Sequence, residues 1–150
     1  MKKILITLSL LMCVNLFAQD FSSLETYELK SEESYVQAEP KVLECANYLF
    51  SHPAKENELN RLSATQFILR WMEGCKHTFN IDTKVTDLLG ENNDLLTLYF
   101  SGITKVVIES GTTKLSDTEV FDKTALLLAA YCKNESNGVK PTKGLKKLMK

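Results

Sequence analysis

The stretch 66-QFILRWMEGCKHTF-79 decides the fold of the residues around it. From Leu62 onward, apolar residues recur every three or four positions, which places them on one face of an α-helix. Trp71 is the only tryptophan, and a large aromatic residue on such a face usually belongs to the core. Gly74 follows the last apolar residue and predicts a left-handed stop after a helix over residues 58–73. The predicted structural core of this helix is Phe67, Ile68, Trp71 and Met72.

Helical spacing also continues on both sides of this stretch. Over residues 92–110 it predicts a helix whose buried face consists of Leu95, Leu96, Tyr99, Ile103, Val106 and Val107. Upstream, we expect a helix that begins near Pro40, because proline fits a first helical turn. Downstream, polar residues suited to an N-cap precede each apolar run, and Gly90 and Gly111 follow two of these runs. No segment alternates in the manner of a strand, so we predict an all-α fold of five to six helices, arranged as antiparallel hairpins or as an irregular bundle. The expected N-caps are Asp82, Asn92 or Asn93, Ser116 in a capping box with Glu119, and Thr142.

The N-terminus has the layout of a secretory signal peptide. Two lysines precede an apolar run over residues 4–17, which is shorter than the roughly 20 residues that a membrane-spanning helix needs. We therefore predict a signal peptide over residues 1–18, a flexible acidic segment over 19–34 and a single helical domain over 35–150. Export to the periplasm or secretion follows, and no membrane span is expected after removal of the signal.

The charge of the chain is mild but unevenly distributed. The formal net charge of the 150 residues is −1, which does not suggest a nucleic-acid partner. Residues 20–39 are mostly acidic, whereas residues 133–150 carry six lysines. Separate charged surfaces of this kind favour steering toward a protein partner over enclosure of a small substrate.

The cysteines suggest a disulfide outside the cytoplasm. After removal of the leader three remain, so one bridge and one free thiol is the simplest arrangement in an oxidising compartment. Because Cys75 is expected in a loop, it is able to turn toward either of the others. We predict a possible disulfide of Cys75 with Cys45 or Cys132.

No established catalytic, cofactor-binding or metal-binding pattern is present. Cys75 and His77 stand two residues apart, but a nucleophilic thiol needs a base fixed by a third group and a pocket around it. The cysteine spacings match no zinc pattern, and the chain has only two histidines. We therefore predict no catalytic residues, no cofactor and no metal, with Cys75 as a disulfide or surface thiol.

Three stretches together give a resemblance to known proteins. The sequences AEPKVLECANYLF, LSATQFILRWMEG and LLAAYCKN, followed by a lysine-rich LKKL ending, resemble a group of small exported bacterial proteins without assigned activity. The likeness covers most of residues 38–148 and implies an all-helical fold and export. It implies no functional residues, and Cys75 and His77 stand where that pattern has threonine and aspartate. Size and helix content are also similar to those of exported helical immunity proteins.

Two classes of function follow from these observations. The first is a non-catalytic protein-interaction module outside the cytoplasm, with an immunity or inhibitor protein as its sharpest form. The second is a small hydrolase whose catalytic groups converge from distant positions. Helical hairpins offer grooves in which a partner peptide is able to lie, so the sequence favours the interaction module.

Overall fold

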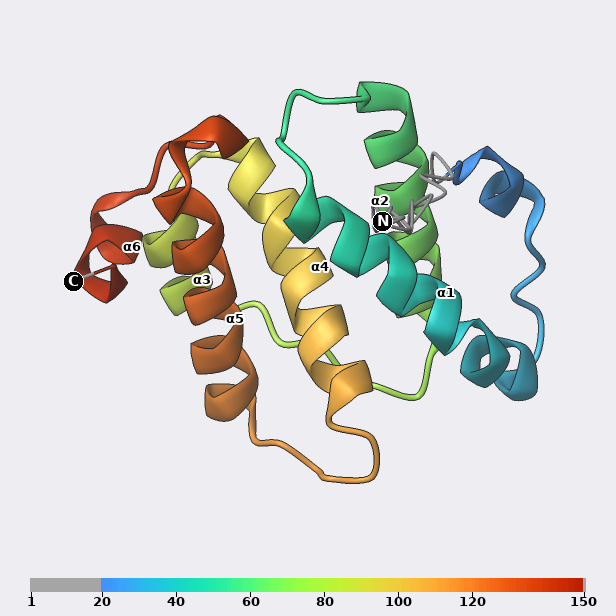
Figure 1. Ribbon diagram of the computed structural model, residues 1–150. Helices are drawn as coiled ribbons and strands as arrows, with labels where there is room; N and C mark the ends of the chain where they lie inside the picture. The colour runs from blue at the N-terminus through green and yellow to red at the C-terminus, as the bar shows by residue number, and fades with distance from the viewer. Residues whose placement is uncertain (1–19, 150) are drawn as a thin grey trace, which may run out of the picture.

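The computed structural model describes residues 20–149 and consists of helices joined by short connections (Figure 1). No strand is found within this range. The prediction of an all-α fold with five to six helices is confirmed. In chain order the elements are η1 (Ser22–Thr26), α1 (Glu32–Ser51), α2 (Glu58–Gly74), α3 (Thr83–Leu89), α4 (Asn93–Glu109), α5 (Asp117–Lys133), η2 (Glu135–Asn137) and α6 (Lys143–Leu148), where η denotes a 3-10 helix.

The helices form an irregular bundle in which α1 and α4 lie at the centre. Helix α1 packs against α2 and α4, and α4 also contacts α2 and α5 (Figure 1). The short helix α3 packs mainly against α6 and less against α4, so the chain is not a series of three sequential hairpins. The largest fully buried side chains include Trp71, Phe67 and Ile68 from α2, Leu49 from α1, and Leu95, Leu98 and Tyr99 from α4.

The caps predicted from the sequence are present. Asp82 accepts hydrogen bonds from the backbone N–H groups of Lys84 and Val85. Asn92 caps α4, Ser116 and Glu119 form the predicted capping box of α5, and Thr142 caps α6. Local hydrogen-bonding chemistry therefore fixes where four of the six helices begin.

The first helix begins earlier than predicted. Ser31 and Ser34 form a capping box, so α1 starts at Glu32 and Pro40 lies inside the helix instead of in its first turn. Proline has no N–H to donate, so α1 lacks one internal hydrogen bond at this position. The buried residues Ala38 and Val42 on either side of Pro40 hold the helix against its neighbours.

Residues 20–31, called the N-terminal segment below, are packed against α2. The prediction of a flexible segment over 19–34 therefore differs from the structure for residues 20–34. Phe21 and Leu24 are buried, and the backbone N–H of Phe21 donates to Asn60 Oδ1 at 2.8 Å. The guanidinium of Arg70 donates to the carbonyl oxygens of Leu24, Glu25 and Tyr27.

Gly74 is the last residue of α2 but is not the left-handed stop that the sequence predicted. Positive φ angles occur at Gly90, Gly111 and Gly138, but Gly74 is not among them. A Cβ atom at Gly74 would lie 2.1 Å from the Tyr35 hydroxyl oxygen. Close approach of the Tyr35 ring, and not a left-handed backbone, therefore requires glycine here.

Two residues of the predicted apolar faces are exposed. Leu62 of α2 is 53% exposed and Leu96 of α4 is 39% exposed. Trp71 and Phe67 are buried as predicted, whereas Met72 is half-buried against the core. The buried faces of α2 and α4 are therefore narrower than apolar spacing alone indicates.

Candidate functional site

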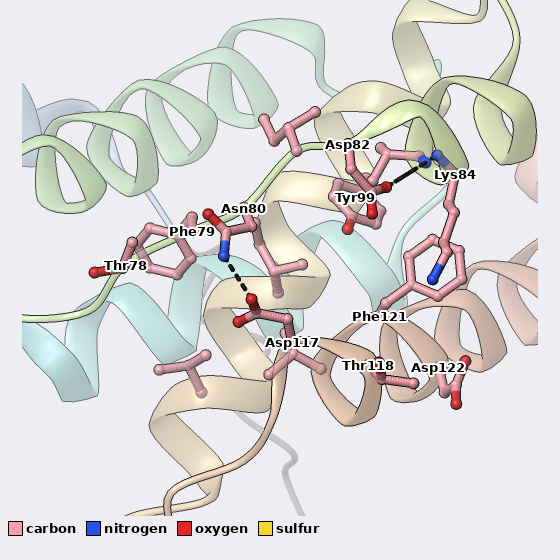
Figure 2. A pocket seen from close by; sticks show the side chains of 15 residues that line it. Thr78, Phe79, Asn80, Asp82, Lys84, Tyr99, Asp117, Thr118, Phe121 and Asp122 are labelled. Atoms are coloured by element: carbon pink, nitrogen blue, oxygen red, sulfur yellow. Dashed lines mark hydrogen bonds between the residues drawn. The ribbon is translucent and has the colours of Figure 1, made fainter.

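The main candidate site is a groove of about 560 Å³ between α4, the start of α5 and the chain that joins α2 to α3 (Figure 2). We call it the α4–α5 groove. Its floor is one face of α4, where Tyr99, Ile103 and Val107 follow each other at intervals of four residues. The other lining residues are Thr78, Phe79, Asn80, Ile81, Asp82, Lys84, Val85, Asp117, Thr118, Val120, Phe121 and Asp122.

One wall of the groove is formed by residues 78–82, which belong to the non-helical chain over residues 76–82, called the edge segment below. The backbone N–H and C=O groups of Thr78, Phe79, Asn80 and Ile81 make no hydrogen bond to any residue between 20 and 149. Thr78, Asn80 and Ile81 are exposed and Phe79 is half-buried, so water is able to reach these backbone groups in the free protein. This wall therefore offers unused donors and acceptors at the rim of a groove, where water or a ligand satisfies them.

The opposite wall is the first turn and a half of α5. Thr118, Asp117 and Asp122 are exposed here, and Val120 and Phe121 are half-buried. The Asn80 side-chain amide donates to Asp117 Oδ2 and links the two walls at one point (Figure 2). Together with the α4 floor, these residues give the groove an apolar base and a polar rim.

The rim carries more negative than positive charge. Asp82, Asp117 and Asp122 line the groove, and Lys84 is the single cation among its lining residues. Asp82 uses Oδ1 for both of its cap hydrogen bonds, and its Oδ2 atom accepts none from a described residue. The groove is therefore suited to a ligand with positive charge.

Tyr99 brings a buried polar group to the groove. Its side chain is only 2% exposed, and its hydroxyl has no hydrogen-bond partner among the described residues. Figure 2 shows the hydroxyl beside the Asp82 carboxylate. Burial, followed by the negative charge of Asp82, raises the pKa of Tyr99 above its ordinary value. The hydroxyl therefore stays protonated at neutral pH and remains available to a ligand as donor and acceptor.

Cys75 and His77 do not line the groove. The Cys75 thiol lies 3.8 Å from the carbonyl oxygen of His77, and burial raises its pKa. The His77 ring packs against Trp71, and its Nε2 atom lies 3.9 Å from Glu39 Oε1. A nucleophilic cysteine needs a lowered pKa and a base at its thiol, and this pair has neither.

The predicted disulfide is not formed among the described cysteines. Cys45, Cys75 and Cys132 are all free. Cys45 on α1 and Cys132 on α5 are buried in the core, whereas Cys75 lies at the end of α2. Burial raises the pKa of Cys45 to about 12, so this thiol is protonated and unreactive at neutral pH.

Two other sequence-based predictions concern membranes and metals. The predicted signal peptide over residues 1–18 lies outside the described residues. No helix within residues 20–149 is both long and apolar enough to cross a membrane. In the same part of the chain, no three histidine, cysteine, aspartate or glutamate residues gather closely enough to hold a metal ion.

Comparison with known proteins adds no assignment. No protein-family model, no curated protein and no solved structure matches the chain. The resemblance to small exported helical proteins therefore stays a prediction, and the argument about function depends on the groove.

Sequence reasoning missed the groove because its parts are far apart in the chain. Tyr99, Ile103 and Val107 were predicted as helix core, and Asp82 was predicted only as a cap. The apolar residues of the edge segment lack helical spacing, although helices are clearly predicted on both sides of it. This break in the pattern was the only sign in the sequence that the segment differs from its neighbours. It did not indicate that α5 would lie opposite.

Proposed function

We propose that this chain is a non-catalytic protein-interaction module that acts outside the cytoplasm and holds its partner in the α4–α5 groove. The observation that carries the proposal is the edge segment, where four consecutive residues, 78–81, have unpaired backbone groups at the rim of an apolar floor. Addition of a partner backbone to the unpaired edge of a sheet is a recurring mode of peptide recognition, and the edge segment offers the same kind of free donors and acceptors although it belongs to no sheet.

The distribution of polar groups supports a protein partner over a small molecule. Small-molecule pockets are mostly apolar and hold a few convergent polar groups. Here the carboxylates of Asp82, Asp117 and Asp122 are spread along the rim, and no three acidic side chains within the described residues converge. A ligand that uses all of them has to extend along the groove, as a peptide segment does.

A small hydrolase is the alternative class of function. The groove contains aspartates and one tyrosine hydroxyl, but neither histidine nor cysteine lines it. Asp117 is held by the Asn80 amide across the groove, and no described serine, cysteine or histidine lines the groove beside Asp82 or Asp122. The interaction module therefore remains the proposal, with an immunity or inhibitor protein as its most specific form.

Affinity capture tests this proposal. The tagged protein without residues 1–18 is incubated with native envelope extract at physiological salt, next to two variants. Thr118→Trp fills the groove from an exposed position on α5, and Thr26→Trp adds the same bulk to exposed η1. Circular dichroism first confirms that both variants are as helical as the parent protein.

We expect a specific protein to be retained by the parent chain and by Thr26→Trp, and to be lost with Thr118→Trp. Equal retention by all three would place the interaction elsewhere and contradict the groove as the docking site. Hydrolysis of a peptide or ester substrate by the parent chain, abolished by Asp122→Asn, would replace the proposal with the enzyme.

A further inference from the structure

We propose that the partner segment held by the α4–α5 groove is an extended peptide that carries lysine or arginine next to apolar side chains. This inference depends on the proposed function and specifies the kind of partner. Three features of the groove support it independently: the unpaired backbone of the edge segment, the unpartnered hydroxyl of the buried residue Tyr99 and the excess of carboxylates on the rim.

The edge segment selects an extended partner over a helical one. Any partner that covers residues 78–81 removes water from their backbone N–H and C=O groups, and each group left unpaired then costs about 1–3 kcal/mol. A helical partner is unable to form these hydrogen bonds, because its own backbone groups are paired internally. An extended peptide presents free backbone donors and acceptors along its edge and is able to form hydrogen bonds with the backbone groups of residues 78–81.

The rim selects positive charge. Three aspartates and one lysine line the groove, and Asp82 keeps one carboxylate oxygen free of hydrogen bonds to described residues. Beside this oxygen lies the hydroxyl of the buried residue Tyr99, which has no hydrogen-bond partner among the described residues (Figure 2). An ammonium or guanidinium group brings several N–H donors and is able to reach both oxygens.

The spacing of the carboxylates favours a peptide over a metal ion. No three acidic side chains in the described chain lie close enough to share one cation. The negative charge instead follows the rim from Asp82 on one wall to Asp117 and Asp122 on the other. A chain with one or more long basic side chains fits this distribution.

The floor selects apolar side chains. Ile103 and Val107 of α4 and Val120 of α5 form apolar surface below the charged rim. In an extended peptide, successive side chains point to opposite faces, so one set enters the groove while the other remains in solvent. Apolar side chains in the inward set would cover the floor, and the aliphatic part of lysine or arginine would pack along it.

Selection from random peptides tests the inference. A phage library of random decapeptides is selected on the protein without residues 1–18 and counter-selected on Thr118→Trp. The enriched peptides are synthesised, and their dissociation constants are measured for the parent chain and for Asp82→Asn, Asp122→Asn and Asp87→Asn. Asparagine retains the capping ability of Asp82, and Asp87 is an exposed aspartate outside the groove.

We expect enriched peptides to combine apolar residues with lysine or arginine. Asp82→Asn and Asp122→Asn should each weaken binding about two- to fivefold at low salt, as partly exposed ion pairs do. Asp87→Asn should change the affinity by less than about twofold, since screening removes distant charges. Methylation of peptide backbone nitrogens should abolish binding, and the bound peptide should slow hydrogen exchange of the amides of residues 78–81.

Other outcomes overturn the inference. Enrichment of acidic or helical peptides, binding that tolerates backbone methylation, or a library without any groove-dependent binder would each contradict it. The proposed function is distinguished by the captured partner. If Thr118→Trp releases that partner but the partner's binding segment is helical or acidic, the groove is still the docking site. The inference that it binds an extended basic peptide is then wrong.

Discussion

Two segments outside the α-helices differ in how their backbone groups are hydrogen-bonded: the N-terminal segment, which precedes α1, and the edge segment, which follows α2. The N-terminal segment is fixed by side chains of α2: Asn60 accepts from its backbone, and Arg70 donates to three of its carbonyl oxygens. The edge segment follows α2, and residues 78–81 receive no such bonds from any described residue. Both segments are anchored by aromatic rings, since Tyr27 packs on Phe67 and Phe79 packs near Trp71.

The difference shows how an irregular segment becomes either structure or binding surface. Aromatic side chains hold both segments in place, but only the first has several backbone groups hydrogen-bonded to side chains of α2. A segment that is positioned and yet unpaired offers its donors and acceptors to a partner without a large ordering cost. This comparison is the physical basis for treating the edge segment as a docking site.

The largest expected effect comes from removing the ring on which the edge segment rests. Trp71 is fully buried, packs against His77 and Phe79, and donates from Nε1 to the carbonyl oxygen of Tyr35 at 2.9 Å. We expect Trp71→Ala to lower the free energy of unfolding by roughly 3–5 kcal/mol, measured by urea denaturation. Trp71→Phe should cost less, because it keeps part of the ring.

A near-zero loss for Trp71→Ala would show that the ring does not support the fold. The edge segment would then have no fixed position, and the comparison with the N-terminal segment would fail.

The second prediction concerns the clamp on the N-terminal segment. Arg70→Met keeps the aliphatic contact but leaves three carbonyl oxygens without their donor. We expect a loss of about 1.5–3 kcal/mol, typical of hydrogen bonds to a charged group. Hydrogen exchange should show that the amides of Phe21, Leu24 and Tyr27 become less protected.

The same experiment sharpens the comparison. The amides of residues 78–81 should exchange rapidly in the parent chain and should be unaffected by Arg70→Met. Strong protection of these four amides in the free protein would mean that they are already paired, and it would remove the main support for a peptide partner.

The sequence predicted the helices well because their signals are local. Asp82, Ser116 and Thr142 each interact with backbone groups within three residues, so the signal lies in neighbouring positions. The stripe around Trp71 was correct for the same reason, since helical spacing by itself places the ring on a buried face. Pro40 misled because the Ser31–Ser34 capping box overrode its preference for a first turn.

The groove and the docking of the N-terminal segment were not predictable from local pattern. Arg70 reaches residues more than 40 positions earlier, and Asn80 meets Asp117 across 37 positions. Tyr99 is a helix-core residue by spacing, and only the packing of α5 opposite it makes its hydroxyl part of a groove. Such contacts depend on how the helices are placed in space, and the local patterns of one sequence do not reveal this placement.

A smaller effect is expected at the contact between α1 and the last residue of α2. Gly74→Ala would place Cβ 2.1 Å from the Tyr35 hydroxyl oxygen, so the ring has to move. We expect a loss of about 1–2 kcal/mol in urea denaturation, although alanine is the better helix former.

The double variant Tyr35→Ala with Gly74→Ala should be more stable than the sum of the single effects predicts, because the clash disappears. Additive losses would show that Gly74 is required for some other reason than the approach of Tyr35.

The smallest expected effect is a pH dependence that comes from His77. Burial of the ring lowers the pKa of His77 below its ordinary value of 6.5, and this outweighs the attraction of Glu39. In the unfolded chain the pKa returns to about 6.5. As the pH falls through that value, the unfolded state takes up a proton that the folded state does not yet bind. The free energy of unfolding therefore decreases until the pH reaches the lower pKa of the folded state.

His77→Gln should remove this pH-dependent decrease. As the pH falls from about 8 to about 5, the free energy of unfolding of the parent should therefore decrease relative to that of the variant. Glu39→Gln should enlarge the decrease in the parent background, because it removes the charge that favours the protonated ring. Urea midpoints across this pH range measure both effects. If the parent instead gains stability relative to His77→Gln at low pH, then Glu39 dominates over burial. The edge segment would in that case be held by an ion pair at its start, in the same charged manner as Arg70 holds the N-terminal segment.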